Sequence, residues 1–140
     1  MTPKPPAPVV RCFLHCREML HDAQNGEHIL IGPQTVVTAP HFPWTVTLNL
    51  FAQLTSLRGQ YLPILQVRDL DDQVLWSLVL PAPVSVPDPL TVHTIACRGY
   101  PATVPRPGRY EVVLLLNDDV VARYPLTVRP WPPAGPGESA

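Results

Sequence analysis

Proline occurs twenty times in this chain of 140 residues, about three times its usual frequency in proteins. Proline has no amide hydrogen to donate, and its ring disrupts the helical turn that precedes it. A chain interrupted so often is poorly suited to long helices, and it suits short strands that are joined by stiff loops. The proline content therefore favours an all-β fold.

Apolar residues alternate with polar ones along most of the chain, which is typical of strands with one buried face. Val46, Leu48, Leu50 and Ala52 show the alternation most clearly. Asn117-Asp118-Asp119 is expected to be the turn of a closing hairpin, because Asn and Asp tolerate left-handed backbone. The runs that indicate strands are 9–19, 27–31, 35–38, 45–52, 61–69, 74–80, 90–98, 108–116 and 120–128. The segments 81–89 and 99–108 are predicted to be loops.

About eight strands with turn signals every ~10 residues predict one antiparallel, immunoglobulin-like β-sandwich. We expect the folded domain to cover residues 9–128. Residues 1–8 and 129–140 are rich in proline and lack a packing pattern, so both are predicted to be disordered tails.

Charge and hydropathy exclude several classes of partner. Ten basic and eleven acidic residues nearly cancel, and the arginines are scattered, so neither nucleic acid nor an anionic membrane surface is an expected partner. No apolar run approaches the ~20 residues that span a bilayer. The first residues, MTPKPPAP, carry no signal-peptide pattern, and three cysteines are an odd number. We therefore expect a cytoplasmic protein with reduced thiols.

Four segments resemble an uncharacterised bacterial family of small immunoglobulin-like β-sandwich proteins, a domain of unknown function. They are the opening strand VVRCFLHCREM, the run HILIG with the later FPWTVTLNL, the hairpin LQVRDLDDQVLWSL, and the closing VPRPGRYEVVLLLNDDVVARYPLTV. The resemblance covers nearly all of the predicted domain. It implies the fold, and it carries no assigned chemistry to any residue.

Cysteine and histidine side chains raise the question of a metal site. Zinc needs about four ligands that converge in a tetrahedron. On one strand, Cys12 and Cys16 point to one face and His15 points to the other, so this spacing does not make a compact site even with Cys97. We interpret the cysteines as small apolar core residues and predict no cofactor.

Aspartates cluster in two of the predicted turns and could hold a cation such as calcium if they gathered at one end of the sandwich. The alternative is that Asp is simply a favoured turn residue. These aspartates are Asp69, Asp71, Asp72, Asp118 and Asp119.

No catalytic residue is identified. Ser56, Ser77, Ser85 and Ser139 lie outside any nucleophile motif, and no glycine-rich phosphate loop is present. The possible bases have no motif partner; they are Glu18, His21, His28, His41 and His93. We therefore expect a protein that is not an enzyme.

Aromatic residues could form a platform on which sugars stack. Trp76 and Tyr110 are expected in the core, and Tyr110 is placed to form a tyrosine corner, in which the hydroxyl bonds to upstream backbone. Trp44, in a loop, is the better surface candidate. The other aromatic candidates are Trp131, Tyr61, Tyr100 and Tyr124.

Two strands carry apolar residues on both faces, although a sandwich strand normally needs one apolar face. Phe51 lies opposite the Val46 set, and Val113 and Leu115 lie opposite the Tyr110 set. We therefore predict a non-enzymatic protein-binding or assembly module, with these three residues as the candidate interface for a protein partner or a second copy. The prolines of 81–89 could instead cover that face. A small-ligand or carbohydrate-binding domain is the alternative function.

Overall fold

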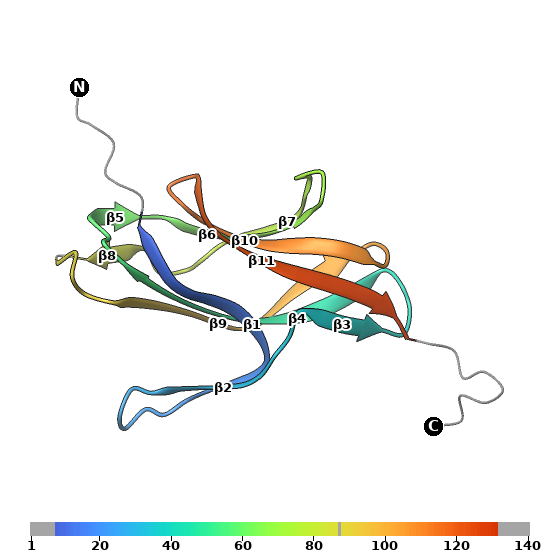
Figure 1. Cartoon of the computed structure of the whole chain (residues 1–140), viewed down its shortest axis with the longest axis horizontal. Helices are drawn as coiled ribbons and strands as arrows, with labels where there is room; N and C mark the ends of the chain where they lie inside the picture. Colours follow the sequence, from blue (N-terminus) through green and yellow to red (C-terminus); the bar gives the residue numbers. More distant parts are fainter. Residues whose placement is uncertain (1–7, 87, 132–140) are drawn as a thin grey trace.

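Two sheets packed face to face form the domain in the computed structural model, which describes residues 8–86 and 88–131. Eleven strands lie in this part of the chain. Figure 1 shows the two sheets as layers, with a hairpin arm that contains β2 turning back below the layer of β1, β4 and β9. The predicted all-β sandwich is confirmed.

The first sheet has four antiparallel strands in the order β2-β1-β4-β9. The strands are β1 (Val9–His21), β2 (His28–Pro33), β4 (Trp44–Thr55) and β9 (His93–Val104). The long strand β1 changes partner along its length. Residues 9–15 pair with β4, and residues 16–21 pair with β2. The second half of β1 and β2 therefore form an arm that leaves the sheet.

The second sheet has five strands in the order β3-β11-β10-β6-β7, and a small pair β5-β8 closes one end of the sandwich. In the large sheet, β3 pairs in parallel with β11 and the other pairs are antiparallel. These strands are β3 (Val36–Ala39), β5 (Gly59–Tyr61), β6 (Pro63–Asp69), β7 (Val74–Val79), β8 (Val84–Val86), β10 (Gly108–Leu116) and β11 (Asp119–Pro130).

The core lies between the sheets and is filled by the alternating residues that the sequence singles out. Leu48 and Leu50 from β4 and Val112 from β10 are almost fully buried in its main cluster. The Tyr110 hydroxyl donates a hydrogen bond to the Arg106 carbonyl, four residues upstream. This bond is the predicted tyrosine corner, a feature of immunoglobulin-like sandwiches.

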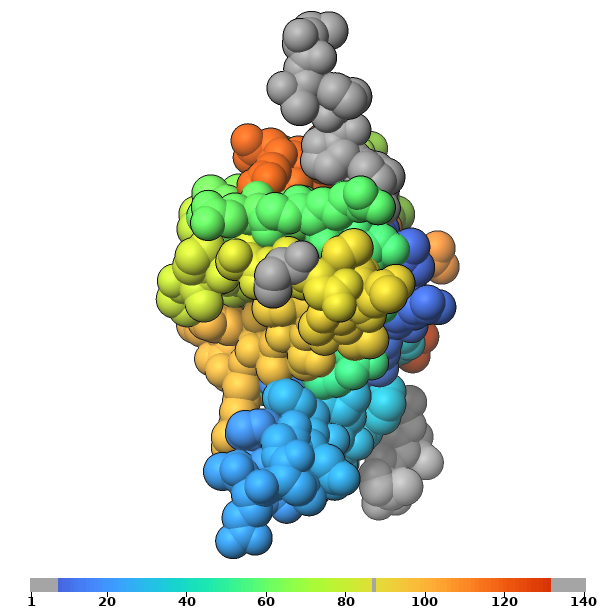
Figure 2. All heavy atoms as spheres, turned by 90° about the vertical axis from the view of Figure 1, so that its left-hand side faces the viewer, coloured from blue at the N-terminus to red at the C-terminus, as the bar shows by residue number. Residues whose placement is uncertain are grey.

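Two predicted loops contain strand. Within 81–89, β8 pairs with β5, and Val84 and Val86 are buried in the second core cluster. This segment therefore closes one end of the core and does not cover the outward face of β10. Figure 2 shows it from outside, as yellow-green and yellow atoms below the green residues of β5.

The predicted loop 99–108 is also strand as far as Val104. Gly99 has φ +75°, and the register of β4 against β9 shifts between Leu48 and Leu50, so a bulge lets the strand pass the glycine. Pro101 is tolerated because β9 is an edge strand.

The C-terminal boundary differs from the prediction by a few residues. β11 reaches Pro130, because Arg129 and Pro130 pair with Thr38 and Ala39. The Trp131 amide then donates to the Ala39 carbonyl at 2.7 Å. The rest of the predicted tails, residues 1–7 and 132–140, lies outside the described residues.

Candidate functional site

A cleft of about 280 Å³ opens beside β9 at the side of the sandwich. One wall is the inward face of β9, and the other is the turn that leaves β7, with Pro81, Ala82 and Pro83. β9 and β7 are the last strands of their sheets at this side, so the cleft lies where the two layers part.

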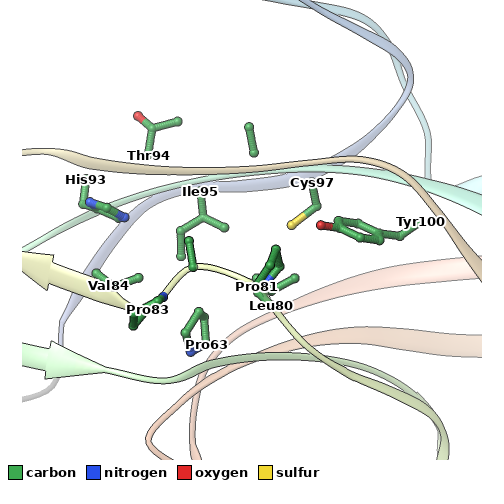
Figure 3. Close-up of a pocket in the computed structure, with 12 residues that line it drawn as sticks. Pro63, Leu80, Pro81, Pro83, Val84, His93, Thr94, Ile95, Cys97 and Tyr100 are labelled. Atoms are coloured by element: carbon green, nitrogen blue, oxygen red, sulfur yellow. The ribbon is translucent and has the colours of Figure 1, made fainter.

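Alternate residues of β9 line the cleft. In Figure 3, His93, Ile95 and Cys97 point from the strand toward Leu80 and the prolines of the turn, and Thr94 points the opposite way. Tyr100 closes the end beyond the Gly99 bulge, with its hydroxyl directed toward Cys97. Every second residue of β9 thus points into the cleft. An extended chain lying beside β9 would have the same two-residue period of side chains.

Burial makes the cleft electrically neutral. Loss of solvent around Cys97 raises the pKa of its thiol to about 11, so at neutral pH the sulfur is protonated and is not a nucleophilic thiolate. Desolvation lowers the pKa of His93 from its ordinary value, so its imidazole is uncharged at neutral pH. The remaining lining residues are apolar apart from Thr94 and Tyr100. The arrangement suits apolar side chains better than charged ones.

The backbone of β9 is unpaired on the side of the cleft. β9 bonds to β4 along its whole length, and no strand of the described residues pairs along its other edge. Alternate amide and carbonyl groups along that edge therefore remain available to an added strand.

Sequence reasoning identified the β9 strand but not this cleft. The inward set Ile95 and Cys97 follows from alternation alone. The opposite wall comes mainly from the segment before β9, which the sequence pattern marks as a simple connection.

Phe51, the first residue of the predicted interface, is not exposed. It does face away from the main core, but only 8% of its surface is accessible. The arm folds back over it. Met19 and Cys16 pack beside the ring, and the His28 imidazole lies 5.4 Å from it, centroid to centroid. The chain itself supplies the cover for which a partner was predicted.

Val113 and Leu115 also face outward, and both are buried, at 0% and 6% exposure. Val113 lies directly between Gln66 of β6 and Arg123 of β11. The Arg123 guanidinium bonds to Glu111 at 3.1 Å and to Asp72 at 3.0 Å, which holds its long side chain across the face. The predicted interface is therefore corrected, because none of its three residues offers an exposed surface.

A row of apolar residues does remain on this outer face. Leu115 lies opposite Ile64 on one side and Val120 on the other, and Ile64 lies opposite Val79. The ends of the row are exposed, Val79 at 53% and Val120 at 39%.

The candidate zinc ligands do not converge. Cys16 packs with Met19 in the outward cluster, and its thiol donates to the Asn49 carbonyl at 3.7 Å. The His15 Nε2 lies 3.2 Å from the Thr47 carbonyl, and burial lowers the pKa of His15. In the part of the chain that the structure describes, no three His, Cys, Asp or Glu side chains are placed to hold a metal ion.

The two Asp-bearing turns lie at opposite ends of their sheet, so the idea of one joint cation site is wrong. The antiparallel register sets Asp69 against Tyr110, whereas Leu116, next to the other turn, faces Pro63. Asp69 Oδ1 accepts the amides of Asp71 and Gln73, as a turn residue does. Asp72 is paired with Arg123, which lowers the pKa of its carboxyl.

The aromatic residues do not form one platform. Tyr61 and Tyr110 are buried, and Trp44 and Trp76 pack against the main core. Trp44 is half-buried and begins β4, so the prediction that it lies in a loop is wrong. The ring of Trp44 contacts that of His41 edge-on.

Tyr124 donates its hydroxyl to the Gln34 carbonyl at 2.8 Å. Trp131 is exposed and lies at the far end of β11.

The remaining sequence candidates for bases lie apart from the cleft, except His93. His21 and His28 stack on each other across the arm, with 4.7 Å between their ring centroids.

No helix in the described residues has the length and hydropathy that a bilayer span requires.

Comparison with known proteins identifies a family and a similar solved structure. Residues 11–129 match a family that is described as a family of unknown function (DUF6941). No curated protein matches the chain. Among solved structures, an immunoglobulin-like protein from Pseudomonas aeruginosa is similar, with a TM-score of 0.44 and 16% sequence identity over 89% of this chain and 98% of that chain.

Proposed function

We propose that this chain, which belongs to the DUF6941 family of unknown function, is a non-enzymatic protein-binding domain that adds an extended segment of its partner to the edge of β9. The observation that carries the proposal is the unpaired edge of β9 beside an apolar cleft. An added strand satisfies the free backbone groups, and its alternate side chains enter the cleft.

The two halves of the β9 edge differ in a way that supports this function. Proteins protect free edges with charges, bulges and prolines, because bare edges recruit other strands. The second half of β9 has all three, in Arg98, the Gly99 bulge and Pro101. The first half, His93–Cys97, has none of them and is the half that borders the cleft. We take the unprotected half to be the binding edge.

The apolar lining sets the kind of segment that binds. The wall residues Ile95, Leu80 and Val84 favour aliphatic side chains, which lose water when they enter. The cleft has a single tyrosine and no charged lining group at neutral pH, so a carbohydrate would find few hydrogen-bond partners there. A protein segment with apolar residues at every second position fits better than a sugar.

Selection of random linear peptides by display on phage, followed by calorimetric titration of the selected peptides, tests the proposal. We expect peptides with alternating apolar residues. Methylation of the peptide backbone nitrogens that face β9 removes their hydrogen bonds and should weaken binding at least tenfold. Methylation of the intervening nitrogens, which face solvent, should have little effect.

Two variants locate the binding site. Ala82 is exposed on the lip of the cleft, so Ala82→Trp should obstruct the cleft without unfolding the domain. Ser77→Trp is the matched control, because Ser77 is exposed on the outer face of the other sheet. Loss of binding in the first variant alone supports the proposal. Failure to select any peptide, or equal binding by both variants, would refute it.

A further inference from the structure

We infer that the bound segment runs antiparallel to β9, with an acidic residue opposite Arg98 near its N-terminal end and apolar residues toward Leu90. This inference rests on the proposed function. It adds the direction of the partner segment and the chemistry of its two ends, which the cleft alone does not specify.

Arg98 marks one end of the binding edge. It is the only charged residue of β9, it is exposed, and it directly follows Cys97 of the cleft. No ion pair formed among the described residues involves Arg98. Arg98 follows the inward-facing Cys97, is exposed, and does not line the cleft, so its side chain lies toward the outer face of the sheet. A carboxylate on the outer face of an added strand would lie beside it.

The other end of the edge is apolar. The turn before β9 is held by the Thr91 amide, which donates to the Asp88 carbonyl at 3.0 Å, and by the Asp88 carboxylate, which accepts the Leu90 amide at 2.9 Å. This ordered turn presents Leu90 at 86% exposure, the highest of any large apolar residue described, with Val92 at 51%. The edge thus changes from cationic to apolar over its length.

The direction follows from the sheet that the segment would extend. Every pairing in this sheet is antiparallel. An antiparallel fifth strand continues that hydrogen-bond pattern. Its N-terminal end then lies beside Arg98, and the residue opposite His93 lies roughly 17 Å further along the segment.

Three synthetic peptides with blocked termini test the inference by fluorescence titration. The matching peptide is Glu-Val-Thr-Val-Thr-Val, in which glutamate faces Arg98 and the valines face the cleft. The second peptide has Lys in place of Glu. The third has the matching sequence in reverse order. The matching peptide should bind the wild type about threefold more tightly than either of the others, the size of effect expected of an exposed ion pair.

Two exposed substitutions complete the test. Arg98→Glu should reverse the preference, so that the lysine peptide binds more tightly than the glutamate peptide. A matching peptide extended by three apolar residues at its C-terminal end, which reach the position opposite Leu90, should bind the wild type more tightly than the parent peptide. Leu90→Asp should abolish that gain.

The outcomes separate this inference from the proposed function. If the glutamate and lysine peptides bind equally to the wild type and to Arg98→Glu, while Ala82→Trp still prevents binding, the inference is wrong and the proposed function stands. Tighter binding of the reversed peptide overturns the antiparallel direction. Binding that is insensitive to Ala82→Trp refutes the proposed function itself.

Discussion

The outward faces of the two sheets bury their unexpected apolar residues by different means. On the four-stranded sheet, the β1–β2 arm folds over Phe51 and covers it with an apolar cluster and a histidine ring. On the five-stranded sheet, no further element is needed. Val113 is enclosed by its cross-strand neighbours Gln66 and Arg123. Ion pairs hold the Arg123 side chain, and hydrogen bonds with Arg68 and Ser77 hold that of Gln66.

This difference shows that an apolar residue on an outward face is weak evidence for a partner. Its exposure depends on the neighbours that strand pairing brings beside it. Unpaired backbone is stronger evidence, because a side chain can be covered by the stem of a neighbouring residue, whereas an open strand edge is a template for a further strand. The β9 edge is therefore a better candidate site than either outward face.

The largest effect is expected when charge is placed at Val113 and Leu115, the two buried residues on the outward face of β10. Val113→Glu combined with Leu115→Glu buries two carboxylates without partners and should cost more than about 4 kcal/mol in the free energy of unfolding. Val79→Glu with Val120→Glu, on the same face but exposed, should stay within about 1 kcal/mol of the wild type. Urea denaturation measures both, and equal stability of the two variants would contradict the burial described here.

Removal of the Phe51 ring, which lies beneath the β1–β2 arm, should have the next largest effect. Phe51→Ala leaves a cavity under the arm and should cost about 3–5 kcal/mol. The matched control is Ile29→Ala, because Ile29 lies on the arm itself at 48% exposure, and it should cost less than about 1 kcal/mol. A Phe51→Ala variant as stable as the control would mean that the arm does not pack on the sheet.

A smaller effect should separate the two contributions of Arg123, namely its aliphatic stem over Val113 and its charge. Arg123→Ala removes both the stem over Val113 and the charge, and should cost about 1 kcal/mol. Arg123→Met keeps most of the stem and should recover part of that loss. Denaturation at low and at high salt provides the measurement. If Met were no better than Ala, the charge and not the stem would be the source of the stabilisation.

The smallest effect should be specific to pH. Arg123 lowers the pKa of Asp72 in the folded protein below its ordinary value of 3.8. The stabilisation from this pair is therefore present above that value and is lost as the pH falls through the lowered pKa. Asp72→Asn should melt at a lower temperature than the wild type at neutral pH, and the difference should vanish in strong acid. A difference that persists in acid would assign the effect to something other than this ion pair.

Local sequence was enough to predict the features that depend on neighbours along the chain. The turn of the β10–β11 hairpin has Asn117 and Asp118 at φ 50° and 67°, the left-handed backbone expected of those residues. The tyrosine corner at Tyr110 was predicted for the same reason, since its hydroxyl bonds to a carbonyl only four residues away. The alternating core faces of β4 and β10 were also predicted correctly.

Features that depend on distant partners were missed. The chain remains a strand through the bulge because the Gly99 amide donates to the Asn49 side chain at 2.9 Å. The Asn49 side chain also donates to the carbonyl of Arg17. β8 is a strand because β5, more than twenty residues earlier, pairs with it. In both places the local sequence is rich in glycine or proline, and it gives no sign of the partner.

The sequence by itself determined that the chain is all-β, which faces of its long strands are apolar, and where its tight turns lie, because these follow from the two-residue period and from backbone preferences of single residues. The tertiary structure alone decided which apolar faces are covered and which open strand edge borders an apolar cleft. Cover and exposure depend on the order of strands in each sheet, and that order brings together residues far apart in the chain. The candidate site is such a product: β9 and the prolines of 81–83 make a cleft only because their strands end the two sheets at the same side.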